Sequence, residues 1–192
     1  MFKLKFWLYI VWWFWQITKH SNRLIIQMEI SHSDYLIVKQ LLSDKELEAV
    51  LRLANIATFK DGGVSATTDA KKVKKNLQIR GEESIEGQQI QQFVLQAISQ
   101  STKIQSAILP KTILPPLISK YEEGMNYGMH VDSPLMGNQF TIRTDVGMTL
   151  FLSDPETYDG GELLILTEVG EQKFKLSPGD AIIYPTTKLH QV

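Results

Sequence analysis

Two histidines and one aspartate have the residue types and the spacing of a metal site. His130 and Asp132 are separated by a single residue, so on a β-strand both side chains would point to one face while Val131 packs away from them. His190 would complete the set, and it is the only histidine that follows His130. Two imidazoles and one carboxylate on one side of a metal leave other coordination positions open, which is the facial arrangement that suits non-haem iron.

Each half of this set also has a simpler explanation. An isolated His-x-Asp tripeptide is often a solvated polar pair, and a lone histidine after a turn is often a surface residue. Taken together, His130, Asp132 and His190 favour metal ligands, because a jelly roll can bring strands that are far apart in the sequence side by side.

Composition limits what kind of protein this is. The 192 residues fit one domain with a sizeable core, and a hydrophobic content of 43% with 21% charged residues is typical of a folded globular chain. A formal net charge of -1 argues against a general nucleic-acid partner. The absence of cysteine excludes disulfides and thiolate ligands, so a metal site must use nitrogen and oxygen donors.

The amino-terminal segment, residues 1–27, is the compositional outlier. It holds all four tryptophans, and Lys3 and Lys5 stand before a continuous apolar run at positions 6–15. That run is roughly half of the ~20 residues that a membrane-spanning helix needs. Three interpretations stay open: an extension or a start site placed ahead of Met28, an interfacial anchor, and a signal peptide without a clear cleavage site. We expect the folded domain to cover residues 28–192 and the protein to be cytoplasmic, with membrane association through residues 1–27 as the alternative.

The first half of the domain predicts two helices. The sequence SDKE at positions 43–46 has the form of a capping box, and apolar residues then recur at helical spacing until the turn signal DGG at 61–63. A second amphipathic pattern runs from about position 83 to 101. Between the two, the lysine-rich stretch at 71–75 predicts a solvated loop or, alternatively, a flap that touches substrate.

The second half predicts β structure without further helices. Prolines at positions 110, 115 and 116 break the chain, and short apolar runs with turn signals follow. Strands are expected at 117–121, 127–131, 148–152, 162–166, 172–176 and 181–184, after an earlier one at 35–42. The sequence DGG at 159–161 predicts a tight turn with glycines at positive φ. Helices followed by many short strands predict an α+β chain whose β part is a sandwich or jelly roll.

Several motifs occur together in the order and at the intervals of one enzyme family. They are YxxGxxYxxHxD at 121–132, RTD at 143–145 with TLFLS at 149–153, YDGGEL at 158–163, LSPGD at 176–180, YP at 184–185 and LH at 189–190. With VKKN at 73–76, this set closely resembles the Fe(II)- and 2-oxoglutarate-dependent dioxygenases. The nearest branch resembles the bacterial PKHD-type hydroxylases, relatives of prolyl 4-hydroxylase, and the likeness runs from about Met28 to the end of the chain.

The resemblance implies a double-stranded β-helix, or jelly roll, with the N-terminal helices packed outside it. It implies Fe(II) ligands at His130, Asp132 and His190. It also implies an enzyme that couples oxidative decarboxylation of 2-oxoglutarate by O2 to hydroxylation of an organic substrate, with L-ascorbate as an additional cofactor candidate. Tyr121 matches a tyrosine that lies near the co-substrate in related hydroxylases, and a half-buried strand aromatic is the alternative.

The sequence departs from the family pattern at its end. In this family a basic residue, usually arginine, follows the distal histidine by roughly ten positions and pairs with the far carboxylate of 2-oxoglutarate. The sequence ends at Val192, so we expect that residue to lie beyond it, with the last strand missing and a sheet edge left unpaired. Neither Arg143 nor Lys188 occupies the matching position, and we expect Arg143 and Asp145 to form a structural salt bridge.

The sequence thus predicts an Fe(II)/2-oxoglutarate dioxygenase. Two alternatives stay open: a non-catalytic cupin-like module that binds a metal or a small ligand, and a fragment whose activity was lost with its tail. The hydroxylated compound could be a peptidyl proline, a free amino acid or another molecule, because kinship in fold gives only analogy. The oligomeric state is equally open.

Overall fold

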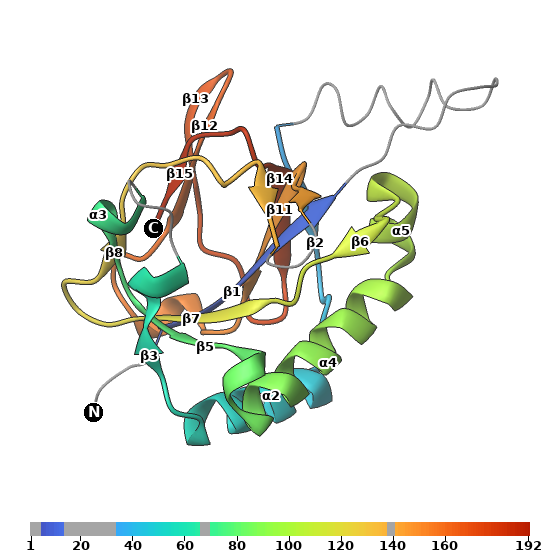
Figure 1. Ribbon diagram of the computed structural model, residues 1–192, viewed down its shortest axis with the longest axis vertical. Helices are drawn as coiled ribbons and strands as arrows, with labels where there is room; N and C mark the ends of the chain where they lie inside the picture. Colours follow the sequence, from blue (N-terminus) through green and yellow to red (C-terminus); the bar gives the residue numbers. More distant parts are fainter. Residues whose placement is uncertain (1–4, 14–33, 66–69, 138–140) are drawn as a thin grey trace.

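A large antiparallel sheet forms the frame of the protein (Figure 1). The computed structural model describes residues 5–13, 34–65, 70–137 and 141–192. The large sheet has eight strands, in the order β2-β14-β11-β1-β7-β5-β3, with β6 alongside β1. These strands are β1 (Lys5–Trp13), β2 (Leu36–Val38), β3 (Lys60–Asp61), β5 (Leu77–Ile79), β6 (Thr112–Ile113), β7 (Leu117–Tyr121), β11 (Val146–Phe151) and β14 (Ala181–Pro185).

A second, smaller layer of strands faces the large sheet. Its central part is a three-stranded sheet in the order β13 (Gly170–Phe174), β12 (Leu163–Thr167), β15 (His190–Gln191). Two short pairs accompany it: β4 (Lys74–Lys75) with β8 (Asn126–Tyr127), and β9 (Leu135–Met136) with β10 (Ile142–Arg143). Two facing antiparallel sheets are consistent with the predicted jelly roll.

The two predicted helices are present and cover the outer face of the large sheet (Figure 1). Helix α2 (Asp44–Ile56) begins at Ser43, whose side chain accepts from the Glu46 N–H while the Glu46 carboxylate accepts from the Ser43 N–H, so the predicted capping box is confirmed. Helix α4 (Ile85–Gln100) is capped by Ser84. A short helix that the sequence did not predict, α5 (Thr102–Ile108), follows α4 directly. The Ser101 side chain caps its N-terminus.

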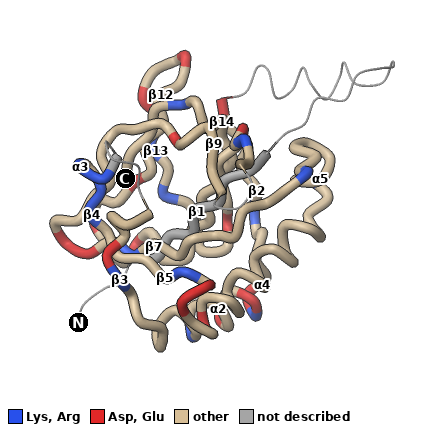
Figure 2. Tube along the Cα trace, in the orientation of Figure 1, with Lys and Arg blue, Asp and Glu red and all other residues tan. Residues whose placement is uncertain are grey.

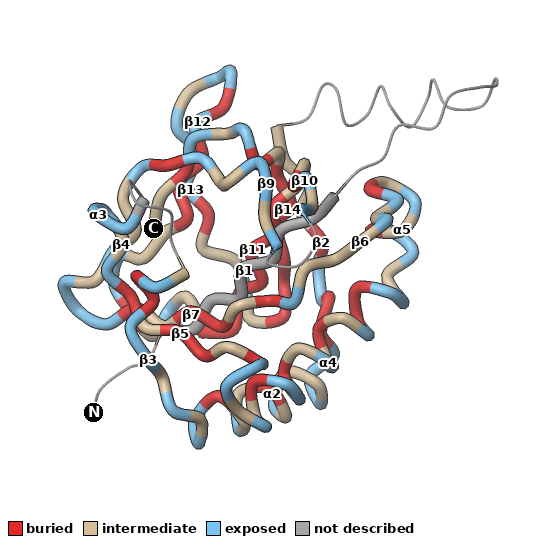
Figure 3. The backbone as a smooth tube through the Cα atoms, in the orientation of Figure 1, coloured by how far each residue is buried: buried red, intermediate tan, exposed pale blue. Residues whose placement is uncertain are grey.

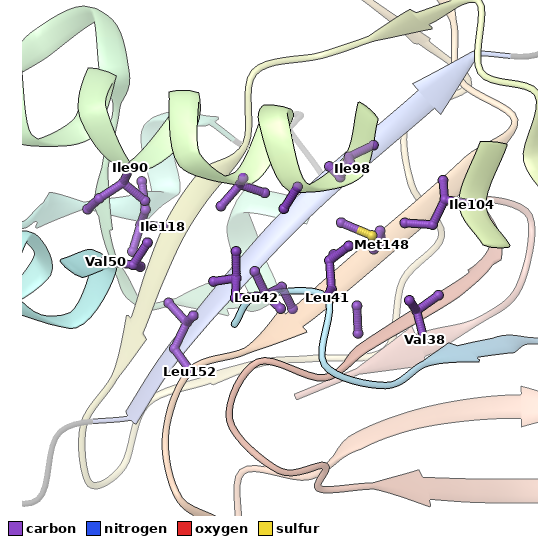
Figure 4. Packing of buried hydrophobic residues seen from close by; sticks show 14 of the residues in the cluster. Val38, Leu41, Leu42, Val50, Ile90, Ile98, Ile104, Ile118, Met148 and Leu152 are labelled. Carbon is purple, nitrogen blue, oxygen red and sulfur yellow. The ribbon is translucent and has the colours of Figure 1, made fainter. Parts of the chain in front are cut away.

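Alternation along β11 and β14 divides the core in two. Met148, Leu150 and Ile183 point toward the helices and join the cluster drawn in Figure 4, which also holds Ile90 and Ile98 of α4. The intervening residues Phe151, Ile182 and Tyr184 face the smaller sheet and belong to the inner cluster. The other members of this cluster come from β7, β12 and β13: Tyr121, Leu163, Ile165 and Phe174. Figure 3 shows β11 and β14 as largely buried segments of the backbone. The large sheet is therefore buried on both faces at β11 and β14.

Strand β1 lies in the middle of the large sheet, between β7 and β11. Its backbone is paired with both neighbours: Trp7, for example, is opposite Phe151 of β11 on one side and Ser119 of β7 on the other. Residues 1–4 and 14–27 of the N-terminal segment lie outside the described residues. Within the part of the chain that the structure describes, no helix is long and apolar enough to cross a membrane.

Most predicted strands are found within a few residues of their expected bounds. The strand expected at 35–42 is only Leu36–Val38, because the backbone turns at Gln40, where φ is 48°. The lysine-rich stretch contains the short helix α3 (Ala70–Val73) and strand β4 rather than a loop throughout. Gly160 and Gly161 have φ values of 64° and 68°, so the tight turn predicted there is confirmed.

Candidate metal centre

The three residues predicted as metal ligands lie together. One candidate ligand atom from each of His130, Asp132 and His190 lies within 4.8 Å of the other two. Asp132 Oδ1 is 4.0 Å from His130 Nε2 and 3.6 Å from His190 Nε2. In the described ranges of the chain, this is the one group of three or more such side chains close enough to share a metal ion.

A β-bulge directs His130 into this group. The backbone exchanges two hydrogen bonds between positions 127 and 192 and two more between positions 130 and 190. Gly128 and Met129 therefore stand opposite the single residue Gln191, which is the arrangement of a bulge. The Gly128 N–H instead donates to the Val73 carbonyl, at 2.9 Å. The regular strand predicted at 127–131 is thus wrong: β8 ends at position 127, and the chain regains a single β-bridge at position 130.

Backbone carbonyls fix the orientation of both imidazoles. His130 Nδ1 lies 2.7 Å from the Gly128 carbonyl oxygen, and His190 Nδ1 lies 2.9 Å from that of Lys188. Because a carbonyl oxygen can only accept, each Nδ1 carries a proton, so the neutral form of each ring presents the lone pair of Nε2 on the side of Asp132. Metal-binding histidines are held in the same way by hydrogen bonds from their second nitrogen.

Burial keeps His130 neutral. The residue is 8% exposed, and this burial, reinforced by the neighbouring His190 and the charge of Lys74, lowers the pKa of His130 to about 4. The hydrogen bond to the Gly128 carbonyl opposes the shift. A neutral imidazole is the form that binds metal ions, so His130 is ready to do so at neutral pH.

The surroundings of the three side chains fit a divalent metal. His130 Nε2 is buried and makes no hydrogen bond, a situation that costs roughly 1–3 kcal/mol in a protein interior and that a metal bond would relieve. Gly147 of β11 leaves room for the carboxylate: a Cβ there would lie 3.1 Å from Asp132 Oδ2 and 3.4 Å from the Tyr184 ring. Two imidazole nitrogens and one carboxylate oxygen are donors that suit non-haem Fe(II).

Three further side chains lie around the candidate metal centre. The sequence assigned no role to Tyr127 or Tyr184, and Lys74 was included only in the lysine-rich stretch that could form a flap. Tyr127 stacks on His130 with ring centroids 3.5 Å apart, and the Tyr184 ring lies 5.0 Å from that of His190. Burial, assisted by the Asp132 charge, raises the pKa of Tyr127 to about 12. The Lys74 ammonium lies 5.0 Å from the centroid of the Tyr127 ring. Their presence within the YxxGxxY, YP and VKKN motifs was the available signal.

Tyr121 points into the space between the two sheets. It is 5% exposed and belongs to the inner cluster with Phe151 and Tyr184, so it is more buried than the half-buried strand aromatic that was the alternative. Burial raises the pKa of Tyr121 well above its usual value, and the neighbouring Asn76 carboxamide opposes that shift. The Tyr121 hydroxyl is therefore a protonated group in the interior near the candidate metal centre.

Arg143 and Asp145 form the salt bridge that the sequence predicted. Arg143 Nη2 lies 2.7 Å from Asp145 Oδ1, and the Arg143 side chain is 70% exposed. Lys188 is paired with Asp34. Both cations thus take part in ion pairs on the surface or near it.

Comparison with known proteins shows the family directly. A family model described as the 2OG-Fe(II) oxygenase superfamily matches residues 116–192. A PKHD-type hydroxylase from Acidovorax ebreus is 41% identical over 158 residues, a match that covers 81% of this chain and 69% of the relative. A PKHD-type hydroxylase from Synechococcus sp. (strain JA-2-3B'a(2-13)) is 43% identical over 159 residues, covering 82% of this chain and 70% of the relative.

Solved structures share the fold at low sequence identity. A prolyl-4-hydroxylase from Pseudomonas putida superposes with a TM-score of 0.60 at 15% identity, covering 87% of this chain and 89% of that one. A prolyl hydroxylase from Trichoplax adhaerens, in complex with a peptide fragment of the hypoxia inducible factor oxygen degradation domain, also gives 0.60 at 16% identity, covering 88% and 80%. Taken with the sequence identities above, these findings show that the chain belongs to the PKHD-type hydroxylases of the 2OG-Fe(II) oxygenase superfamily.

Proposed function

We propose that this protein is an Fe(II)- and 2-oxoglutarate-dependent hydroxylase in which His130, Asp132 and His190 hold the iron. The observation that carries the assignment is the convergence of one ligand atom from each residue within 4.8 Å, with His130 Nε2 buried and without a hydrogen bond. Family membership supports the enzyme class and both iron and 2-oxoglutarate. When bound, the iron and the co-substrate supply the oxidising chemistry for hydroxylation of a C–H bond.

The chain itself contributes orientation and a dry environment. The Gly128 and Lys188 carbonyls hold both imidazoles in the tautomer that exposes Nε2. Tyr121 lies beside 2-oxoglutarate in this proposal, because its buried, protonated hydroxyl can donate a hydrogen bond to an anionic ligand.

The experiment is co-substrate turnover with a ligand variant. The purified chain, supplied with Fe(II), O2 and 2-oxoglutarate, should release succinate above the rate without protein, even before its substrate is known. Asp132→Ala should abolish this release, because one carboxylate donor is lost from the candidate metal centre. Succinate formed by Asp132→Ala at the rate of the unchanged protein would contradict the ligand assignment.

The substrate and the accessory cofactor belong to the same proposal. One structural neighbour is a prolyl hydroxylase bound to a peptide fragment, which supports testing proline-containing peptides first. Stimulation by L-ascorbate is expected under the same conditions and is measured in the same assay. The family match does not favour the non-catalytic cupin-like alternative. Cytoplasmic localisation stays a prediction.

A further inference from the structure

Lys74 is a partly buried cation on the face that carries the candidate metal centre. In the pair β4–β8, Lys74 stands directly opposite Tyr127, and opposite residues of an antiparallel pair present their side chains on the same face. Tyr127 stacks on His130, and the Lys74 ammonium lies over the Tyr127 ring. Figure 2 shows the lysines of α3 and β4 along this part of the chain. Lys75, the next residue, points the other way and is exposed.

The charge of Lys74 reaches the proposed ligands. Asp132 favours the charged form of Lys74, and the Lys74 charge in turn lowers the pKa of His130. Burial, with help from Arg80, lowers the pKa of Lys74 itself to about 8, while Asp132 and Asp61 oppose this shift. The ammonium is therefore the main form at neutral pH.

A chain of polar side chains holds Lys74 in place and leaves part of its hydrogen-bonding capacity available. Lys74 Nζ donates to Ser65 Oγ at 2.7 Å, Ser65 Oγ lies 2.6 Å from Gln78 Oε1, and Gln78 Nε2 donates to Ser119 Oγ at 3.0 Å. An ammonium has three N–H donors. Since Ser65 takes one of them, donors remain for a ligand.

Asn76 is a second polar residue on the face that carries Lys74. It follows Lys74 by two residues, as β4 leads into β5, and is 3% exposed. Asn76 lies close enough to Tyr121 to affect the pKa of its hydroxyl. The two groups nevertheless do not complete a hydrogen bond, and neither polar atom of the carboxamide has a partner among the described residues. Buried amides are normally hydrogen-bonded, so this one indicates a ligand.

We propose that Lys74, with Asn76 and Tyr121 beside it, binds a carboxylate of 2-oxoglutarate. This inference rests on the proposed function. An ammonium, an amide N–H₂ and a phenol are all donors, and donors are what a carboxylate accepts from. A divalent ion held with Asp132 and next to Lys74 leaves a net positive charge, which a dicarboxylate neutralises. Lys74 is thus a positioning residue for the co-substrate.

Calorimetric titration of the Mn(II)-loaded full chain tests this without turnover. The ligands are 2-oxoglutarate and 2-oxopentanoate, which lacks the far carboxylate. Lys74→Met should raise the Kd for 2-oxoglutarate by roughly ten- to a hundredfold, the range for a lost charge-assisted hydrogen bond. Lys74→Gln should raise the Kd for 2-oxoglutarate by a similar factor, because glutamine is polar but uncharged. Lys74→Arg should keep most of the affinity, because arginine keeps the charge. Lys75→Met is the matched control and should bind both ligands as the unchanged protein does.

The two ligands distinguish which carboxylate is bound. Loss of 2-oxoglutarate affinity with unchanged 2-oxopentanoate affinity assigns the far carboxylate, and loss of both assigns the one shared by the two compounds. Equal Kd values for Lys74→Met, Lys74→Gln and Lys75→Met with both ligands would overturn the inference. Unchanged protein that binds Mn(II) but not 2-oxoglutarate would contradict the proposed function as well. Mn(II) affinity within about twofold of the unchanged protein shows in each variant that the fold and the metal ligands are intact.

Discussion

His130 and His190 exchange two backbone hydrogen bonds, each with an N···O distance of 2.9 Å, so the two proposed imidazole ligands are fixed to each other before any metal binds. His190 is also paired with Ile165 of β12 on its other side. The spacing of the two rings, whose centroids lie 4.2 Å apart, is therefore a property of the strands. Such preorganisation lets a metal ion bind without reordering the chain.

Removing the His190 imidazole should eliminate the stabilisation of the folded protein by Mn(II), while the backbone pairing of the strands is kept. In the unchanged protein, Mn(II) at a hundred times its Kd should raise the free energy of unfolding by about 2.7 kcal/mol. His190→Ala should gain almost nothing at the same concentration, because one of three donors is missing. Urea unfolding with and without Mn(II) measures this difference. Gln191→Ala, a change in the same strand, should keep the full gain, and equal gains in both variants would argue against His190 as a ligand.

Gly147 should tolerate no side chain without loss of metal affinity. A Cβ at this position would lie 3.1 Å from Asp132 Oδ2, closer than ordinary contact, so the carboxylate would have to shift from its present position. Gly147→Ala should weaken Mn(II) binding by roughly ten- to a hundredfold, which is the usual effect of mutating residues that support metal ligands. Gly63→Ala is the control, since its Cβ would approach the Asp61 carboxylate, at 3.3 Å. The prediction fails if both variants bind Mn(II) equally well.

The metal-free protein should lose stability in mild acid because of His130. Its pKa is about 4 in the folded chain, whereas a histidine in an unfolded chain titrates near 6.5. Between these values the unfolded state binds a proton that the folded state does not, so the free energy of unfolding decreases as the pH falls from about 6.5 to 4. From pH 7 to pH 5 the loss attributable to His130 should be roughly 2 kcal/mol. Urea unfolding should show that the free energy of unfolding decreases less in His130→Gln than in the unchanged protein, by this amount. Identical decreases in the two proteins would contradict the prediction.

Deleting residues 1–27 should destabilise the protein severely. β1 is paired with both β7 and β11, so its removal leaves two unpaired edges in the middle of the large sheet. The truncated chain should aggregate or lose its cooperative thermal transition, which light scattering and circular dichroism would detect. A truncated chain that starts at Met28 and melts like the full one would instead favour a start site there. Equal partitioning of the two chains onto lipid vesicles would remove the membrane anchor as an interpretation.

Local patterns in the sequence were enough to predict the two long helices and most strands. The capping box at Ser43 and the recurrence of apolar residues fix α2 without reference to the rest of the chain. Apolar runs between turn signals likewise predicted β7 and β14, because both strands are buried and short. For the candidate metal centre, residue types and the motif order indicated His130, Asp132 and His190, which the structure brings together.

Features that depend on distant partners could not be read from the sequence. The apolar run at positions 6–15 fits a strand as well as a membrane segment, because continuous hydrophobicity has no period that separates them. The bulge at Gly128 depends on the Val73 carbonyl, and the need for glycine at position 147 depends on Asp132 and Tyr184. Lys74 stood in a lysine-rich stretch whose residues look alike until β4 divides them between two faces.

The position of β1 also sets the order in which the protein can fold. This strand is synthesised long before its partner β11: position 7 pairs with position 151. Contacts between such distant positions slow folding, because a long loop must close before any of them forms. The nascent chain therefore carries an apolar strand without its neighbours until these partners are synthesised, and we expect folding yields in cells to depend on chaperones that bind such segments.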